Sequence, residues 1–172
     1  DHIPYDNISP SREIQSERIQ TLYKIFNDTK NKIILTSINA IIQKTVNFKF
    51  VNMNVLEIYK NKKISFDDLI RKIISLGFQR TSLVRENSEF AIRGSIIDIF
   101  TINKENPIRL DFDNNLIEKI SEFDKISQRK IKEINEKIIL HCSNELLIND
   151  KSLNLFRKNF RKLFSEYRNS NI

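Results

Sequence analysis

The chain has 172 residues, of which 40% are hydrophobic and 30% are charged, so it can bury a core and is unlike an intrinsically disordered chain. It contains neither a signal-peptide pattern nor an apolar run near the roughly 20 residues that cross a bilayer, so no membrane partner is expected. Cys142 is the single cysteine, which excludes an internal disulfide and indicates a cytoplasmic protein. The net charge of +7 favours an acidic protein or nucleic acid as partner, although basic and acidic residues are interspersed.

Residues 1–54 have the pattern of part of an α/β layer. Ser9 and Pro10 suit the N-cap and first position of a helix. Residues 33–35 are a short apolar run, typical of a strand covered on both faces, and Ser37 can cap a short helix after it. A helix, a buried strand and a second helix in this order predict a partial α/β layer.

From residue 55 the pattern becomes that of an antiparallel sheet with one main helix. Ser65 is expected to cap this helix and Gly77 to end it in the left-handed conformation. Strands are expected at residues 55–59, 78–84, 89–101, 108–112, 116–123 and 134–142. Asn114 tolerates the positive φ of a tight hairpin between two of them. Residues 55–142 therefore predict an α+β domain.

An amphipathic helix is expected in residues 143–172, beginning near Asp150. Its apolar side chains recur on one side of the helix: Leu153, Phe156, Phe160, Leu163, Phe164 and Tyr167. We expect this helix to return to the first domain and to pack against it.

Residue patterns typical of catalysis are missing from the sequence. Its two glycines, Gly77 and Gly94, cannot build a phosphate-binding loop, so no nucleotide cofactor is expected in this segment. His141 and Cys142 are adjacent and point to opposite faces of a strand, so we interpret them as structural rather than as metal ligands. We interpret the acidic residues of the expected strands, Asp98, Asp111 and Asp113, as members of solvated strand faces and a turn. The segment is not expected to be an enzyme.

The stretch at residues 89–100 is the most informative. Gly94 interrupts an expected strand, which predicts a β-bulge or a close approach of another backbone. Such a bulge would turn Arg93 toward a carboxylate on a partner, whereas the alternative is that Arg93 pairs with an acid of its own sheet. Phe90 is either an exposed apolar anchor or a core residue.

This stretch, together with residues 108–113, resembles the signature strands of the UvrB-like second domain, which the excision-repair subunit UvrB shares with transcription-repair coupling factors. Residues 4–10 and 33–44 resemble the coupling factors more closely, because UvrB would carry a glycine-containing Ile-Tyr-Gly stretch after the first strand. The resemblance implies a partial P-loop-NTPase-like α/β layer without nucleotide binding, a second domain that interacts with UvrA, and a helix that follows it.

In that family, the full-length protein is an ATP-driven DNA translocase that displaces stalled RNA polymerase and couples transcription to nucleotide excision repair. The resemblance implies that ATP, magnesium, RNA polymerase and double-stranded DNA are bound by other domains, and that this segment recruits UvrA. We place the expected docking surface around Arg80, Glu89, Phe90, Arg93 and Gly94, with aromatic and arginine side chains as the anchors.

Three alternatives remain at this stage. The chain could be a fragment of UvrB itself, which would require an ATP-binding loop upstream. It could be a generic basic module for nucleic acid, whose affinity would fall steeply with salt. It could also pack against the motor half of its parent protein and mask the UvrA site, which is compatible with the main interpretation.

Overall fold

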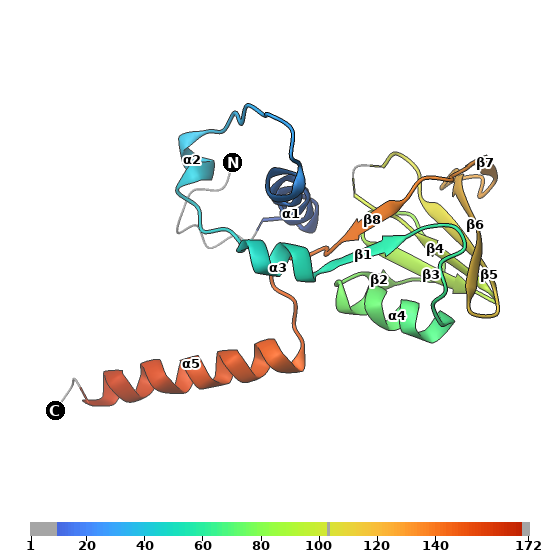
Figure 1. Cartoon of the computed structure of the whole chain (residues 1–172). Helices are drawn as coiled ribbons and strands as arrows, with labels where there is room; N and C mark the ends of the chain where they lie inside the picture. The colour runs from blue at the N-terminus through green and yellow to red at the C-terminus, as the bar shows by residue number, and fades with distance from the viewer. Residues whose placement is uncertain (1–9, 103, 170–172) are drawn as a thin grey trace.

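The computed structural model describes residues 10–102 and 104–169. Five helices occur in this part of the chain: α1 (Arg12–Asn27), α2 (Ile38–Ile41), α3 (Phe48–Met53), α4 (Phe66–Ser75) and α5 (Asp150–Asn169). The strands are β1 (Val55–Ile58), β2 (Gln79–Arg80), β3 (Glu89–Arg93), β4 (Ile96–Ile99), β5 (Ile108–Asp113), β6 (Leu116–Phe123), β7 (Lys130–Glu133) and β8 (Ile138–His141). Figure 1 shows the strands and α4 gathered in one body, with α1 to α3 beside it.

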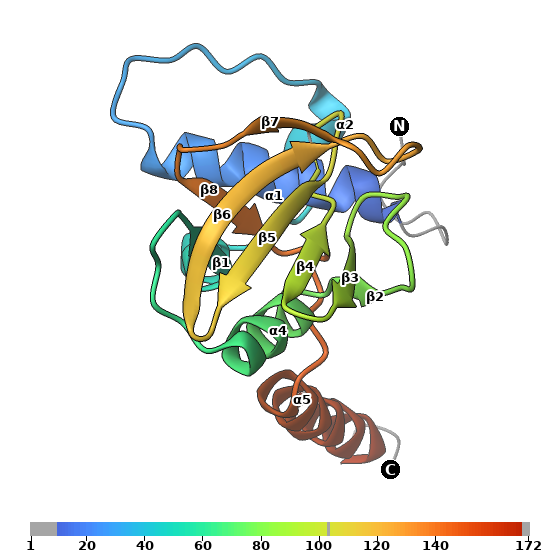
Figure 2. The same ribbon diagram turned by 90° about the vertical axis from the view of Figure 1, so that its right-hand side faces the viewer.

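The main sheet has six strands in the order β2-β3-β4-β5-β6-β7, and β1 pairs with β8 in a separate two-stranded sheet. All neighbours in the main sheet are antiparallel except β2 and β3. Leu69 and Ile73 of α4 are fully buried in the same core cluster as Ile97 and Leu110 of the main sheet, so α4 covers one face of that sheet (Figure 2). The predicted α+β arrangement of one main helix and an antiparallel sheet is confirmed for this region.

Both ends of α4 form as the sequence predicts. The Ser65 hydroxyl accepts a hydrogen bond from the backbone N–H of Asp68 at 3.1 Å, which caps the first turn. Gly77 ends the helix with a φ of +88°, a conformation that is costly for other residues. A Cβ atom at Gly77 would lie 2.6 Å from Oγ of Ser143, so this glycine is also required by close packing.

The β5–β6 and β3–β4 hairpins differ in how well they were predicted. Asn114 has a φ of +52° in the turn between β5 and β6, as expected. Gly94 has a φ of +58° and lies with Ser95 in a two-residue turn between β3 and β4, so residues 89–101 form two paired strands rather than one bulged strand. Apart from Gly94 and its two chain neighbours, no described residue has an atom within 4 Å of a Cβ built on Gly94, which excludes the predicted close approach. The backbone conformation of the hairpin alone explains this glycine.

The N-terminal part departs from the prediction in two places. Ser11 caps α1, two residues after the expected Ser9, which lies outside the described residues. Residues 33–35 form no strand, because no neighbouring strand among the described residues offers hydrogen bonds to their backbone. The side chains of Ile33 and Leu35 are 90% and 91% exposed. The short helix capped by Ser37 is confirmed as α2.

Helix α1 packs against the second domain instead of standing apart from it. Ile19 of α1 is fully buried in the same core cluster as Leu56 and Leu140 of the two-stranded sheet. The Ser16 hydroxyl donates a hydrogen bond to the carbonyl of Cys142 at 3.3 Å, and the rings of Tyr23 and His141 meet edge-on. The core therefore extends across the boundary that we expected near residue 54.

Three of the predicted strands are shorter than expected, β1 by a single residue, and one strand was missed. Strand β2 covers only Gln79–Arg80 of the expected residues 78–84, and β8 covers Ile138–His141 of residues 134–142. Strand β7, Lys130–Glu133, was not predicted because all four of its residues are exposed and three are charged. Such a strand lacks the alternation of apolar and polar residues that marks a half-buried strand.

Helix α5 confirms the amphipathic helix expected from about Asp150. Its apolar residues Phe156, Phe160 and Phe164 stack along one side and are 47–64% exposed. Figure 1 shows α5 leading away from the sheets, and its expected packing against the first domain stays a prediction. Within the described ranges, no helix has the length and hydrophobicity of a membrane span.

Candidate partner-docking site

The candidate site lies on the face of the main sheet opposite α4. Ile97 and Ile99 of β4 point into the core, so the alternation of side chains along the strand places Asp98 on the other face. There Asp98 lies directly opposite Ala91 of β3 and Arg109 of β5. Its side chain is only 1% exposed.

Arg109 binds Asp98 through two hydrogen bonds. Its Nε lies 2.7 Å from Oδ1 and its Nη2 lies 3.0 Å from Oδ2, the fork geometry that suits a guanidinium and a carboxylate. The guanidinium also lies over the ring of Phe123, with its carbon 4.3 Å from the ring centre. The hydrogen bonds that Arg109 donates to Asp98 raise the pKa of Arg109 above its ordinary value, although burial acts in the opposite direction. Asp98 and Arg109 thus form a mostly buried ion pair.

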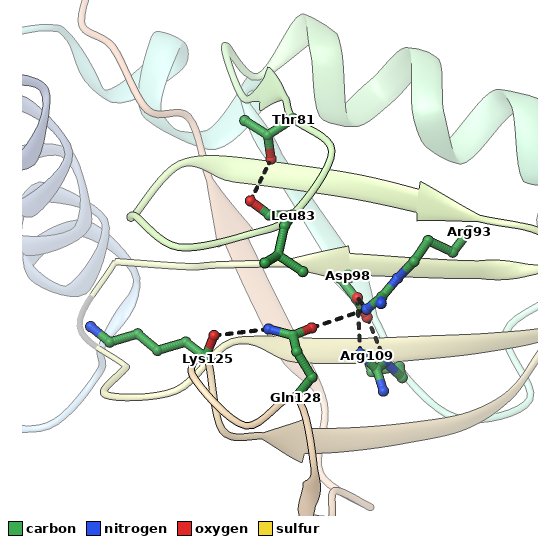
Figure 3. Close-up of polar contacts among 7 residues, drawn as sticks. All are labelled: Thr81, Leu83, Arg93, Asp98, Arg109, Lys125 and Gln128. Atoms are coloured by element: carbon green, nitrogen blue, oxygen red, sulfur yellow. Dashed lines mark hydrogen bonds and ion pairs between the residues drawn. The ribbon is translucent and has the colours of Figure 1, made fainter.

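Arg93 reaches the same carboxylate from the end of β3 (Figure 3). Its Nη2 donates to Oδ2 of Asp98 and, at 3.1 Å, to Oε1 of Gln128. The Arg93 side chain nevertheless remains 43% exposed, whereas that of Arg109 is 19% exposed. The prediction that Arg93 turns outward without an internal partner is therefore wrong, and the alternative that it pairs with an acid of its own sheet is correct. The pairing fixes the guanidinium but leaves part of it accessible.

We call the four side chains of Arg93, Asp98, Arg109 and Gln128 the Arg93 cluster. It contains two guanidinium groups and one carboxylate, so its net charge is positive. The more exposed of the two cations is Arg93, so the uncompensated charge is presented at the surface. A carboxylate of a partner could bind there with little rearrangement, because the sheet and Asp98 already hold the guanidinium.

The other predicted site residues have different positions. Arg80 is exposed on β2, at the edge of the sheet. Glu89 is partly buried, and its Oε2 accepts hydrogen bonds from the backbone N–H groups of Arg85 and Glu86 at 2.8 and 2.9 Å. Its carboxylate therefore shapes the preceding loop.

Phe90 is fully buried in the main core cluster. The prediction of Phe90 as an exposed anchor is wrong, since its side chain points to the face that α4 covers. Gly94 contributes only the turn of the hairpin, as described above.

The loop of residues 81–88 covers the part of this face beside the Arg93 cluster. Val84 of the loop packs with Ala91 and Phe100 in a small second core cluster. Thr81 begins the loop, and its hydroxyl donates to the carbonyl of Leu83 at 3.2 Å (Figure 3). The loop therefore covers the part of the face formed by Ala91 and Phe100, while the Arg93 side chain stays partly exposed.

Three members of the cluster were missed by sequence reasoning. Asp98 was interpreted as part of a solvated strand face, but it is buried beneath Arg93 and Arg109. Arg109 and Gln128 were not proposed for the site. The sequence contained one indication of the site, because Asp98 is the single acidic residue among the isoleucines of β4. Its partners Arg93 and Arg109 can be identified only once the register of the strands is known.

His141 and Cys142 take structural positions. Burial lowers the pKa of His141 to about 4 and raises the pKa of the Cys142 thiol to about 12, so the histidine is neutral and the thiol protonated at neutral pH. No group of three potential metal-binding side chains occurs among residues 10–102 and 104–169.

Comparison with known proteins agrees with this arrangement. The sequence profile described as the UvrB interaction domain matches residues 56–144, about half of the chain. The chain belongs to the UvrB interaction domain family. The matched range of this UvrB interaction domain begins in β1 and ends just after β8, so it contains both sheets and the whole Arg93 cluster.

Similar full-length proteins carry the name transcription-repair-coupling factor. The chain is 34% identical to that of Haemophilus influenzae over 96% of its own length and 32% identical to that of Escherichia coli over 94%. The identity to the Rickettsia prowazekii protein is 31% over 95% of the chain. The chain spans only 14% of the length of each of these relatives. The predicted relationship to transcription-repair coupling factors is confirmed.

Proposed function

We propose that this segment recruits UvrA and that the Arg93 cluster is the centre of the docking surface. The observation that carries the proposal is a half-exposed guanidinium held on a buried carboxylate in the UvrB interaction domain. Arginine that is fixed before binding loses little side-chain freedom on association, and arginine is enriched among the residues that dominate interface energies. The complementary group on UvrA is an acidic side chain.

Arg80 extends the proposed surface along the edge of the sheet, and Lys125 extends it on the other side. Both side chains are exposed, and the carbonyl of Lys125 accepts a hydrogen bond from Gln128 of the cluster. Long-range attraction between such cations and an acidic partner increases the association rate and weakens with salt.

The parent protein is proposed to be an ATP-driven DNA translocase that displaces stalled RNA polymerase and so couples transcription to nucleotide excision repair. This proposal rests on the names of the relatives and on the resemblance of the sequence. ATP, magnesium, RNA polymerase and double-stranded DNA would be bound by other parts of that protein, and this segment would contribute no catalytic group. We further propose that α1 to α3 belong to a P-loop-NTPase-like layer and that α5 packs against it in the parent protein.

The proposal is tested by titrating the 172-residue chain with purified UvrA at two salt concentrations. The Arg93→Ala variant should bind UvrA more weakly than the wild type and should show a smaller dependence on salt. Arg71→Ala is the matched control, because Arg71 is exposed on α4, on the opposite face of the sheet. Unchanged affinity of Arg93→Ala, or equal losses in both variants, would reject the Arg93 cluster as the docking surface.

A further inference from the structure

The turn between β6 and β7 brings Gln128 to the Arg93 cluster and holds it there. Oδ1 of Asp124 accepts the backbone N–H of Ser127 at 2.6 Å, and the backbone N–H of Gln128 donates to the carbonyl of Asp124 at 2.8 Å. The backbone N–H of Asp124 donates in turn to the carbonyl of Arg129 at 2.9 Å. Gln128 itself has a φ of +61°, a conformation that few non-glycine residues adopt. The position of its side chain is thus determined by a closed network of backbone hydrogen bonds.

The side-chain amide of Gln128 has only one orientation that satisfies its neighbours. Its Nε2 donates to the carbonyl oxygen of Lys125 at 2.9 Å, and a carbonyl oxygen can only accept. Oε1 must therefore point the other way, where it accepts the hydrogen bond from Nη2 of Arg93 (Figure 3). The same Nη2 is also bound by Asp98. Two acceptors from different parts of the chain thus direct one edge of the Arg93 guanidinium inward.

A neutral acceptor at position 128 has a consequence for the charge of the cluster. Within the cluster, Asp98 is shared between two guanidinium groups, so one positive charge is left over. Asp111 of β5, which also acts electrostatically on Arg109, lies outside the cluster. An amide oxygen orients Arg93 without supplying a further negative charge. A carboxylate in the same place would accept the same hydrogen bond and would also neutralise the charge that is available to a partner.

We propose that Gln128 is a positioning residue of the docking site: it orients Arg93 for an acidic side chain of the partner and leaves the charge of Arg93 uncompensated. This inference rests on the proposed function, and it adds the turn of residues 124–129 to the docking surface. The partner group that the arrangement fits is a carboxylate that approaches the exposed edge of the Arg93 guanidinium.

The test compares Gln128→Glu and Gln128→Ala in binding to UvrA. Gln128→Glu keeps the size and shape of the side chain but loses the hydrogen bond to the carbonyl of Lys125, a loss that Gln128→Ala shares. Gln128→Glu should weaken binding by about tenfold, the effect of losing one favourable charge contact at an interface. Gln128→Ala should weaken it by only about twofold to fivefold, because Asp98 still holds Arg93. Thermal unfolding of each variant checks that the fold is retained.

A double-mutant cycle separates positioning from a purely structural role. In an Arg93→Ala background, Gln128→Glu should change the affinity for UvrA by less than about twofold, since the charge that it neutralises is gone. Asn154→Asp supplies the same change in net charge on the exposed surface of α5 and should leave the affinity unchanged. Equal effects of Gln128→Glu with and without Arg93, or equal effects of Gln128→Glu and Asn154→Asp, would overturn the inference.

The outcomes also distinguish this inference from the proposed function. If Arg93→Ala weakens binding and Gln128→Glu does not, the docking surface stands and the role of Gln128 is rejected. If the wild-type chain does not bind UvrA, or Arg93→Ala binds as the wild type does, both proposals are rejected. If Gln128→Ala lowers the affinity for UvrA as much as Gln128→Glu does, the partner requires the position of Arg93 and not its uncompensated charge. That result would overturn the charge argument.

Discussion

Arg109 and Asp98 lie directly opposite each other on β5 and β4 and form two hydrogen bonds of 2.7 and 3.0 Å. Asp98 is buried, whereas the Arg109 side chain is 19% exposed. The pair links the two central strands on the face that α4 does not cover. The same carboxylate holds Arg93, so a single residue connects the stability of the sheet with the proposed docking surface.

Asp98→Ala should destabilise the domain. The substitution leaves the guanidinium of Arg109, which is 19% exposed, without its acid, and removing one partner of a buried pair costs about 3–5 kcal/mol. Urea unfolding of wild type and variant measures the change in the free energy of unfolding. Glu118→Ala is the control, because Glu118 is half exposed, and its loss should cost at most about 1 kcal/mol. Equal stabilities of the two variants would show that Asp98 is dispensable.

Substitutions at Phe90 and Arg93 should affect different properties, although both residues lie on β3. The first should lower stability and the second should weaken UvrA binding. Phe90→Ala removes a fully buried ring and should lower the free energy of unfolding by about 3–5 kcal/mol. Arg93→Ala should change stability by less than about 1 kcal/mol, since Arg109 still neutralises Asp98. It should weaken UvrA binding by roughly 1–4 kcal/mol, the range for an interface anchor.

Chemical unfolding and calorimetric titration with UvrA measure the two effects independently. A stable Phe90→Ala variant that fails to bind UvrA would contradict the position of Phe90 in the core. An Arg93→Ala variant that is as unstable as Phe90→Ala would show that Arg93 mainly serves the fold.

The two glycines should differ in their sensitivity to substitution. Alanine at Gly94 meets open space and should cost about 1 kcal/mol, from the positive φ alone. Alanine at Gly77 has the same backbone strain and also places Cβ 2.6 Å from the Ser143 hydroxyl, so a cost of about 2–4 kcal/mol is expected. Thermal unfolding of the two variants shows which substitution lowers the stability more. A Gly94→Ala variant less stable than Gly77→Ala would refute the assignment of close packing to Gly77.

His141 should make the stability of the domain depend on pH. Burial is the main cause that lowers the pKa of His141 from 6.5 to about 4 in the folded protein, and Lys24 adds to the effect. As the pH falls, the unfolded chain takes up the proton first, so stability is full above about pH 6.5 and is lost between pH 6.5 and about pH 4. After allowance for partial exposure, the expected loss is roughly 1–2 kcal/mol.

The measurement is urea unfolding of wild type and His141→Asn at pH 7.5 and pH 4.5. The carboxylates titrate in both proteins, so the difference between their pH dependences isolates His141. A variant that loses as much stability as the wild type over this range would exclude His141 as the cause.

Local structure was predictable wherever a short stretch of chain supplies its own physical reason. Ser65 and Gly77 delimit α4 because capping and positive φ are properties of the adjacent backbone. Asn114 marks its hairpin for the same reason. The apolar run at residues 33–35 misled the prediction, because a strand requires hydrogen bonds from a neighbour that the run itself does not contain.

The sequence by itself determined the α+β pattern of the domain and the turns at Gly77 and Asn114, and it singled out Arg93 as a candidate, since these depend on periodicity and local turn chemistry. Only the tertiary structure decided that Phe90 is buried, that Asp98 lies beneath two arginines and that Gln128 belongs to the site. The reason is the register of the strands. A strand alternates its side chains between two faces, and only its pairing with distant strands determines which face is covered and which residues meet across it.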